Sequence, residues 1–124
     1  MFVSLSRACC ELLRFEWYLR RGNFGGLYRR VKNCPVRDRP GRKIDPHRIV
    51  QSMNLACAFY FKKVLCLQRA AATTCLLRKT GIPAQFVIGV QTLPYGAHAW
   101  VEVDGAVVND KSYMPQMYSV LSRC

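Results

Sequence analysis

Apolar side chains recur at helical spacing through the first part of the chain. They stand at alternating steps of three and four residues, at Leu5, Ala8, Leu12, Phe15 and Leu19. Residues with this spacing share one face of an α-helix, and a run of glycines beginning at residue 22 should end that helix near Arg21. A short second helix is expected over residues 27–32. The proline-rich segment 33–46 should form a loop.

Asp45 and Pro46 predict the start of a third helix. Aspartate is a good N-cap, and proline fits the first helical position, where its missing N–H would have no partner in any case. This helix should run toward Phe61. A break is expected over residues 62–65. From Cys66 the chain is rich in alanine, leucine and arginine and then reaches a glycine, which predicts a fourth helix with a glycine C-cap.

The hydrophobic period changes from helix to strand beyond the fourth helix. Residues 84–90 are rich in β-branched and aromatic side chains, and residues 98–103 alternate in a strand pattern. Both segments should therefore be strands, joined by a turn over residues 92–97. Trp100 is expected to pack in the core.

An Asp-Gly pair at residues 104–105 predicts a tight hairpin whose return strand covers residues 106–108. Beyond Asp110 the pattern is less regular. Helices thus precede a small antiparallel sheet, so the predicted class is α+β. We divide the chain into an N-terminal helical, basic region, residues 1–44, which is a candidate docking surface, and a core, residues 45–124.

Composition excludes several classes of protein. Hydrophobic residues make up 51% of the 124 residues, too many for a disordered chain, and no apolar run reaches the roughly 18 residues of a membrane-spanning helix. The N-terminus lacks the pattern of a signal peptide, so we expect a cytoplasmic protein. The seven cysteines are odd in number and irregularly spaced, which favours free thiols over disulfides or zinc ligands.

The formal net charge of +12 is large for a chain of this size and attracts acidic partners or substrates. Lysine and arginine cluster within residues 14–48, so nucleic acid has to be considered as a partner. No helix-turn-helix, zinc-finger or aromatic RNA-binding signature accompanies the cluster, which argues against it. An acidic protein or peptide partner, or a simple solvated surface, remains open.

Cys66, His98 and Asp110 are the candidate catalytic residues. A thiol protease needs a thiolate, a base, and a third group that orients the base. Cys66 stands at a predicted helix N-terminus, where unpaired N–H groups and the helix dipole stabilise a thiolate and an oxyanion. His98 begins one strand of the hairpin, and Asp110 follows the other. A lone cysteine or histidine is more often structural, so spacing alone leaves these three as candidates.

Hairpin geometry places Asp110 near His98 but does not settle which side chain faces it. If Val103 pairs with Ala106, counting outward puts His98 opposite Lys111 and diagonal to Asp110. A bulge or a slightly different turn would bring the carboxylate round to the imidazole. The spacing therefore favours proximity of His98 and Asp110 without requiring it.

Five blocks of sequence occur in a characteristic order between residues 66 and 110. They are Cys66-Leu67-Gln68-Arg69, Leu77-Arg78-Lys79-Thr80-Gly81-Ile82-Pro83-Ala84, Val87-Ile88-Gly89-Val90, Ala97-His98-Ala99-Trp100-Val101-Glu102 and Val107-Val108-Asn109-Asp110. Together they resemble the transglutaminase-like leader peptidases of lasso-peptide biosynthesis, over roughly residues 45–115. The brevity of the chain resembles the split form of that family, in which peptide recognition and proteolysis sit on separate polypeptides.

The resemblance implies a papain/transglutaminase-like fold and a cysteine peptidase that removes the leader from a precursor peptide. It implies that Cys66, His98 and Asp110 form the catalytic triad, a chemistry that uses no metal or cofactor. The implied partners are the precursor, a small leader-recognition protein and, as a further possibility, the ATP-using lasso cyclase that closes the released core. Residues 1–44 match the family less specifically, and their role stays open.

Three other functions remain as alternatives. The same triad would serve a transglutaminase-like acyltransferase, the same fold could serve a non-catalytic peptide-binding module, and the charge could serve a nucleic-acid-binding protein. The complete Cys/His/Asp set argues against the binding module, and the lack of a recognition motif argues against nucleic acid. Products distinguish the two enzymes, because hydrolysis shortens a peptide and acyl transfer cross-links it.

Overall fold

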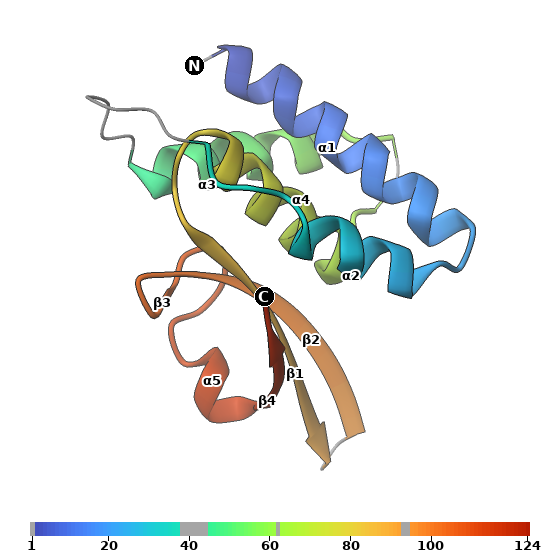
Figure 1. Ribbon diagram of the computed structural model, residues 1–124, viewed down its shortest axis with the longest axis vertical. Helices are drawn as coiled ribbons and strands as arrows, with labels where there is room; N and C mark the ends of the chain where they lie inside the picture. Colours follow the sequence, from blue (N-terminus) through green and yellow to red (C-terminus); the bar gives the residue numbers. More distant parts are fainter. Residues whose placement is uncertain (1, 38–44, 62, 93–94) are drawn as a thin grey trace.

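A layer of helices covers one face of a small antiparallel sheet in the computed structural model (Figure 1). The predicted α+β class is therefore confirmed. None of the described helices is both long enough and apolar enough to cross a membrane. Parts of the predicted loop over 33–46, the break over 62–65 and the turn over 92–97 lie outside the described residues. The residues that the structure describes are 2–37, 45–61, 63–92 and 95–124.

The first two helices are α1, Phe2–Arg20, and α2, Phe24–Lys32. α1 ends where the sequence predicts, and the three middle residues of its apolar stripe are fully buried. α2 begins earlier than predicted because Asn23 caps it, with Asn23 Oδ1 accepting a hydrogen bond from the N–H of Gly26 at 2.9 Å. Gly25 and Gly26, which the sequence pattern marks as helix breakers, therefore lie in the first turn of α2.

The next two helices are α3, Pro46–Phe59, and α4, Cys66–Lys79. Asp45 caps α3 as predicted, and its Oδ1 accepts a hydrogen bond from the N–H of His47 at 3.0 Å. α3 ends slightly before the predicted position. α4 begins at the predicted residue, and Gly81 has the positive φ, +94°, that a glycine beyond a helix end commonly adopts.

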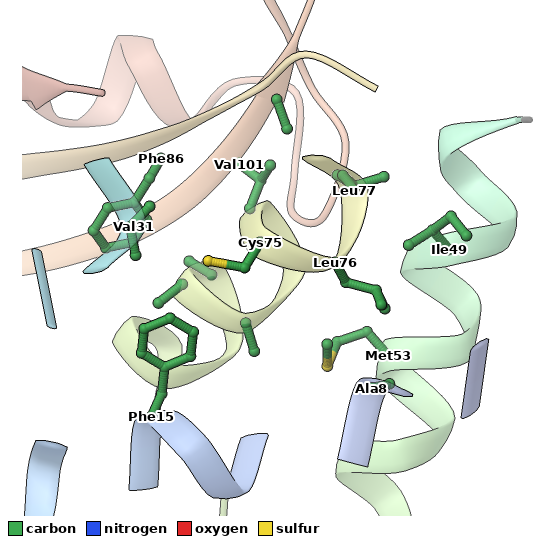
Figure 2. Packing of buried hydrophobic residues seen from close by; sticks show 14 of the residues in the cluster. Ala8, Phe15, Val31, Ile49, Met53, Cys75, Leu76, Leu77, Phe86 and Val101 are labelled. Atoms are coloured by element: carbon green, nitrogen blue, oxygen red, sulfur yellow. The ribbon is translucent and has the colours of Figure 1, made fainter. Parts of the chain in front are cut away.

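The core is organised around α4, which packs against α1, α3 and the sheet (Figure 2). Alanines on α4 are fully buried and allow the neighbouring elements to approach closely. Residues 1–44 and 45–124, separated above on sequence grounds, contribute to this single core. The side chains that converge there include Ala8, Phe15, Val31, Ile49, Met53, Cys75, Leu76, Leu77, Phe86 and Val101.

The sheet has the strand order β3-β2-β1-β4, and neighbouring strands are antiparallel. β1 spans Ala84–Thr92 and β2 spans Tyr95–Val103, and they pair along their whole length. Both strands are longer than predicted, so the broad turn over 92–97 is wrong at its ends. Gly96 lies within the predicted turn, but it pairs with Gln91 inside the ladder.

β3 is a short return strand, Ala106–Val107. The hairpin before it is as predicted, since Val103 pairs with Ala106 and both turn residues have positive φ, 52° for Asp104 and 78° for Gly105. The predicted strand to residue 108 is one residue too long. This early end of the ladder matters for the site.

The chain beyond Asp110, where the sequence pattern is irregular, forms two further elements. Helix α5, Met114–Met117, and strand β4, Ser119–Arg123, fold back on the sheet. β4 pairs with β1 along the opposite edge from β3. Met114 packs with Val87 and Trp100 in a second, smaller apolar cluster, on the face of the sheet away from α4 because strand residues alternate between faces.

Candidate active site

Cys66 is the first residue of α4 and is half-buried. Leu65 precedes it as an extended N-cap residue, and no side chain among the described residues caps this end of the helix. The first N–H groups of an α-helix have no partner inside the helix. Together with the positive end of the helix dipole, they can stabilise a thiolate or an oxyanion beside Cys66.

His98 and Asp110 form a hydrogen-bonded pair. His98 Nε2 lies 2.6 Å from Asp110 Oδ2, a short distance typical of a charge-assisted hydrogen bond. The two side chains are 23% and 14% exposed, so the pair is only partly open to solvent. Because Nε2 is committed to the carboxylate, Nδ1 is the ring nitrogen left to exchange a proton with another group.

The early end of the strand ladder brings Asp110 to His98. Asn109 Oδ1 accepts a hydrogen bond from the N–H of Val101 at 2.8 Å, in the place that a backbone carbonyl would take in a continuing ladder. The chain turns out of the strand there, and the Asp110 side chain faces His98. A side chain that substitutes for the backbone, rather than a bulge or an altered turn, therefore resolves the register question.

The surroundings of Asp110 favour its ionised form. Burial alone would raise the pKa of Asp110, but hydrogen bonds from His98 and from the N–H of Lys111 oppose that effect. The positive charges of His98 and Arg69 act in the same direction and hold the pKa of Asp110 below its ordinary value. The carboxylate is thus available as a charged acceptor at neutral pH.

We expect the stabilisation contributed by the Asp110 carboxylate to disappear in acid. A pKa that is lower in the folded than in the unfolded chain gives stability that is present above the unfolded value, about 3.9, and lost as the pH falls through the folded value. The free energy of unfolding of wild type and Asp110→Asn should therefore differ near neutral pH and converge in acid. A difference that stayed constant across this range would contradict the assignment.

Cys66 and His98 line the same cavity, which has a volume of about 220 Å³. No hydrogen bond joins the Cys66 thiol to the His98 ring within the described part of the chain. Both residues therefore border one cavity, although the His98 ring itself packs with Trp100 and Tyr118. The other lining residues are Phe24, Leu67, Ile88, Val90, Ala97, Ala99 and Leu121, all of them apolar.

Aromatic packing fixes the ring of His98. The centroid of the Tyr118 ring lies 5.6 Å from that of His98, and the Trp100 centroid lies 6.3 Å away. Gly89 pairs with His98 across the sheet, and a Cβ there would meet the Trp100 ring at 2.7 Å. Trp100 is fully buried, as predicted, and its Nε1 donates to a Glu102 carboxylate oxygen at 2.9 Å. Glu102 thus supports the ring packing.

Two residues close to the site in sequence have roles that only the structure reveals. Gln68 is buried, and its Nε2 donates to the backbone oxygen of Leu12 at 2.9 Å, so it ties α4 to α1. Arg69 Nη2 donates to the backbone oxygen of Asn109 at 3.2 Å. The sequence did carry a signal for Arg69, because it stands one helical turn after Cys66.

Cys34 is a second thiol with an unusual environment. A hydrogen bond from Cys75 outweighs burial and holds the pKa of the Cys34 thiol below its ordinary value. Cys34 lines a different cavity, together with Arg78 and Pro83, and neither histidine of the chain lines that cavity. A thiol without a neighbouring histidine lacks the usual proton acceptor and donor of acyl transfer.

Two comparisons relate the chain to known proteins. The chain is 39% identical over 71 residues to the microcin J25-processing protein McjB of Escherichia coli. This match covers 56% of the chain and 34% of McjB, so the chain spans about a third of that relative. A search of solved structures found no significant match. The model of the transglutaminase-like superfamily matches residues 9–123, and the chain therefore belongs to this superfamily.

Proposed function

We propose that this protein is a cysteine peptidase that removes the leader from a ribosomally made lasso-peptide precursor. The pairing of His98 with Asp110, beside a cavity that Cys66 also lines, supports the proposal most strongly. The relative McjB is named for the processing of microcin J25, which favours a precursor peptide as the substrate. If the protein left a candidate precursor intact in the presence of its leader-recognition partner, the proposal would fail.

The proposed reaction assigns one role to each of the three side chains. The Cys66 thiolate attacks the carbonyl carbon of the last leader residue, and the N–H groups at the start of α4 donate to the oxyanion. His98 holds the proton and passes it to the amine of the departing core. Asp110 keeps the ring oriented and stabilises the imidazolium. Water, deprotonated by His98, then hydrolyses the thioester and releases the leader.

The outer surface of α1, α2 and the turn between them is our candidate docking surface for the leader or its recognition protein. The acidic residues of this region, Glu11 and Glu16, are 3% and 5% exposed. Leu13 and Trp17 are about half exposed on the same helix. Exposed apolar side chains surrounded by positive charge suit an acidic partner that carries an apolar anchoring residue. The basic residues of the surface are Arg7, Arg14, Arg20, Arg21, Arg29, Arg30 and Lys32.

Reversing the charge of this surface should weaken substrate delivery. With Arg29, Arg30 and Lys32 changed to Glu, we expect kcat/KM for the delivered precursor to fall about tenfold or more at low salt, since favourable steering becomes repulsion. The dependence on salt should also flatten, whereas kcat should change little. Arg48→Glu on α3 is the control. An unchanged rate with an unchanged salt dependence would remove docking from this surface.

A further inference from the structure

The proposed triad is divided between two parts of the fold. Cys66 begins α4, whereas His98 lies on β2 and Asp110 lies in the segment after β3. A misplacement of about 1 Å between reacting groups can lower a rate about a hundredfold. The reaction therefore requires a contact that keeps the exit of the hairpin at a fixed place on α4.

Arg69 makes such a contact. It stands three residues after Cys66, about one turn along α4, and its Nη2 donates to the backbone oxygen of Asn109 at 3.2 Å. Within the described residues this is the hydrogen bond that its side chain makes, and its buried Nε has no partner. The guanidinium is thus directed to the segment next to Asp110 rather than to an ion pair at the surface.

Asn109 passes this constraint to Asp110. It is 8% exposed and is held from two sides, by Arg69 at its carbonyl and by Val101 at its side-chain oxygen. The next residue is Asp110, whose carboxylate reaches His98. The positive charge of Arg69 also favours the ionised carboxylate. A chain of contacts therefore leads from the helix that carries Cys66 to the ring of His98.

We infer that Arg69 is a positioning residue, which clamps the Asn109–Asp110 segment to α4 so that His98 is presented to Cys66. The inference rests on the proposed function, because the clamp matters only if the thiol and the imidazole react together. Without Arg69, the segment keeps its link to β2 but loses its link to α4. His98 would then be less firmly oriented, and its imidazolium would stabilise the Cys66 thiolate less.

The pH dependence of Cys66 alkylation tests this inference without a substrate. Iodoacetamide reacts with the thiolate, and mass spectrometry with fragmentation locates the modification at Cys66. We expect the midpoint of the wild-type profile to lie below that of His98→Ala, because the imidazolium favours the thiolate. Arg69→Met should shift the midpoint toward that of His98→Ala. Arg69→Lys should return the midpoint part of the way to the wild-type value, because an ammonium group can still donate to a carbonyl.

A second readout and a matched control separate positioning from general stability. Arg69→Met should lower kcat/KM for precursor cleavage by about 10- to 100-fold. Lys79→Met alters another basic residue of α4, one that pairs with Glu11 rather than with the hairpin. It should leave the alkylation profile at the wild-type position even if it lowers the melting temperature as much.

The outcomes distinguish the two levels of the proposal. If wild type and His98→Ala have the same alkylation profile, thiol and imidazole are not coupled and the proposed function fails. If those two differ but Arg69→Met follows wild type, only the role of Arg69 is overturned. A shift of equal size in Lys79→Met would also overturn it, because the effect would then reflect loss of stability alone.

Discussion

Replacing Cys66 with alanine is expected to abolish cleavage of the precursor. In the proposed mechanism the thiolate forms the covalent thioester, and loss of the nucleophile from a catalytic triad typically costs about a millionfold in kcat. Alanine favours helix and adds no bulk at the first residue of α4, so the fold should be retained. Liquid chromatography with mass detection of the remaining precursor measures the rate, and circular dichroism verifies the fold.

Cys34→Ala is the matched control for that experiment. Cys34 is another thiol of the chain, with a pKa held below its ordinary value by Cys75, so acidity alone would make it a competing nucleophile. The Cys34→Ala protein should cleave the precursor at the wild-type rate, because no histidine lines the cavity beside Cys34. Activity retained in Cys66→Ala and lost in Cys34→Ala would assign the reaction to the other thiol.

Replacing Arg78 with methionine is expected to destabilise the fold by about 3–5 kcal/mol. Arg78 is 7% exposed near the end of α4. Within the described residues no acidic side chain pairs with it, and backbone carbonyls surround its guanidinium instead. Its nitrogens donate to the backbone oxygens of Ala84 at 3.0 Å, Cys34 at 3.3 Å and Cys124 at 2.8 Å, and to that of Val31.

The size of the expected effect follows from what methionine leaves behind. Methionine fills similar space but donates nothing, so carbonyls at the ends of α2, β1 and β4 would lose a charged donor in a buried place. Arg78→Lys should recover only part of the loss, because an ammonium cannot reproduce the planar fork. Urea unfolding of the three proteins gives the free energies. A loss below about 1 kcal/mol in Arg78→Met would show that these bonds contribute little.

The helices could be predicted because their signals are local. Apolar spacing, the Asp45–Pro46 start and the glycine after α4 each act within one or two turns of chain, so no tertiary information was needed. The same holds for the turn at Asp104 and Gly105, whose positive φ values suit those residue types. α2 was misjudged at its start because the cap from Asn23 outweighs the low helix propensity of glycine.

The strands at the edges could not be predicted because their pairing is tertiary. β4 has a weak apolar pattern, and it becomes a strand by bonding to β1, which lies far away in sequence. The lengths of β1 and β2 likewise follow from their mutual register. Their ladder continues through Gly96, a residue type that propensity alone assigns to turns.

The candidate site could be predicted only in part from the sequence. Cys66 and His98 are marked by helix start, strand position and family resemblance. The orientation of Asp110 depends on the Asn109 side chain replacing a backbone acceptor, which no spacing rule contains. Arg69 is marked by its place one helical turn after Cys66, but its acceptor and those of Arg78 are backbone oxygens, which sequence spacing does not identify.

Hydrolysis and acyl transfer differ in the atoms that the product gains or loses, so the products of one reaction in heavy-oxygen water decide between them. We expect wild-type protein, precursor and leader-recognition partner to yield two fragments whose masses together equal the precursor plus one water. The heavy oxygen should lie in the new C-terminal carboxyl group of the leader, with no such product from Cys66→Ala. A cross-linked product that has lost ammonia, or a precursor that remains intact, would contradict a leader peptidase.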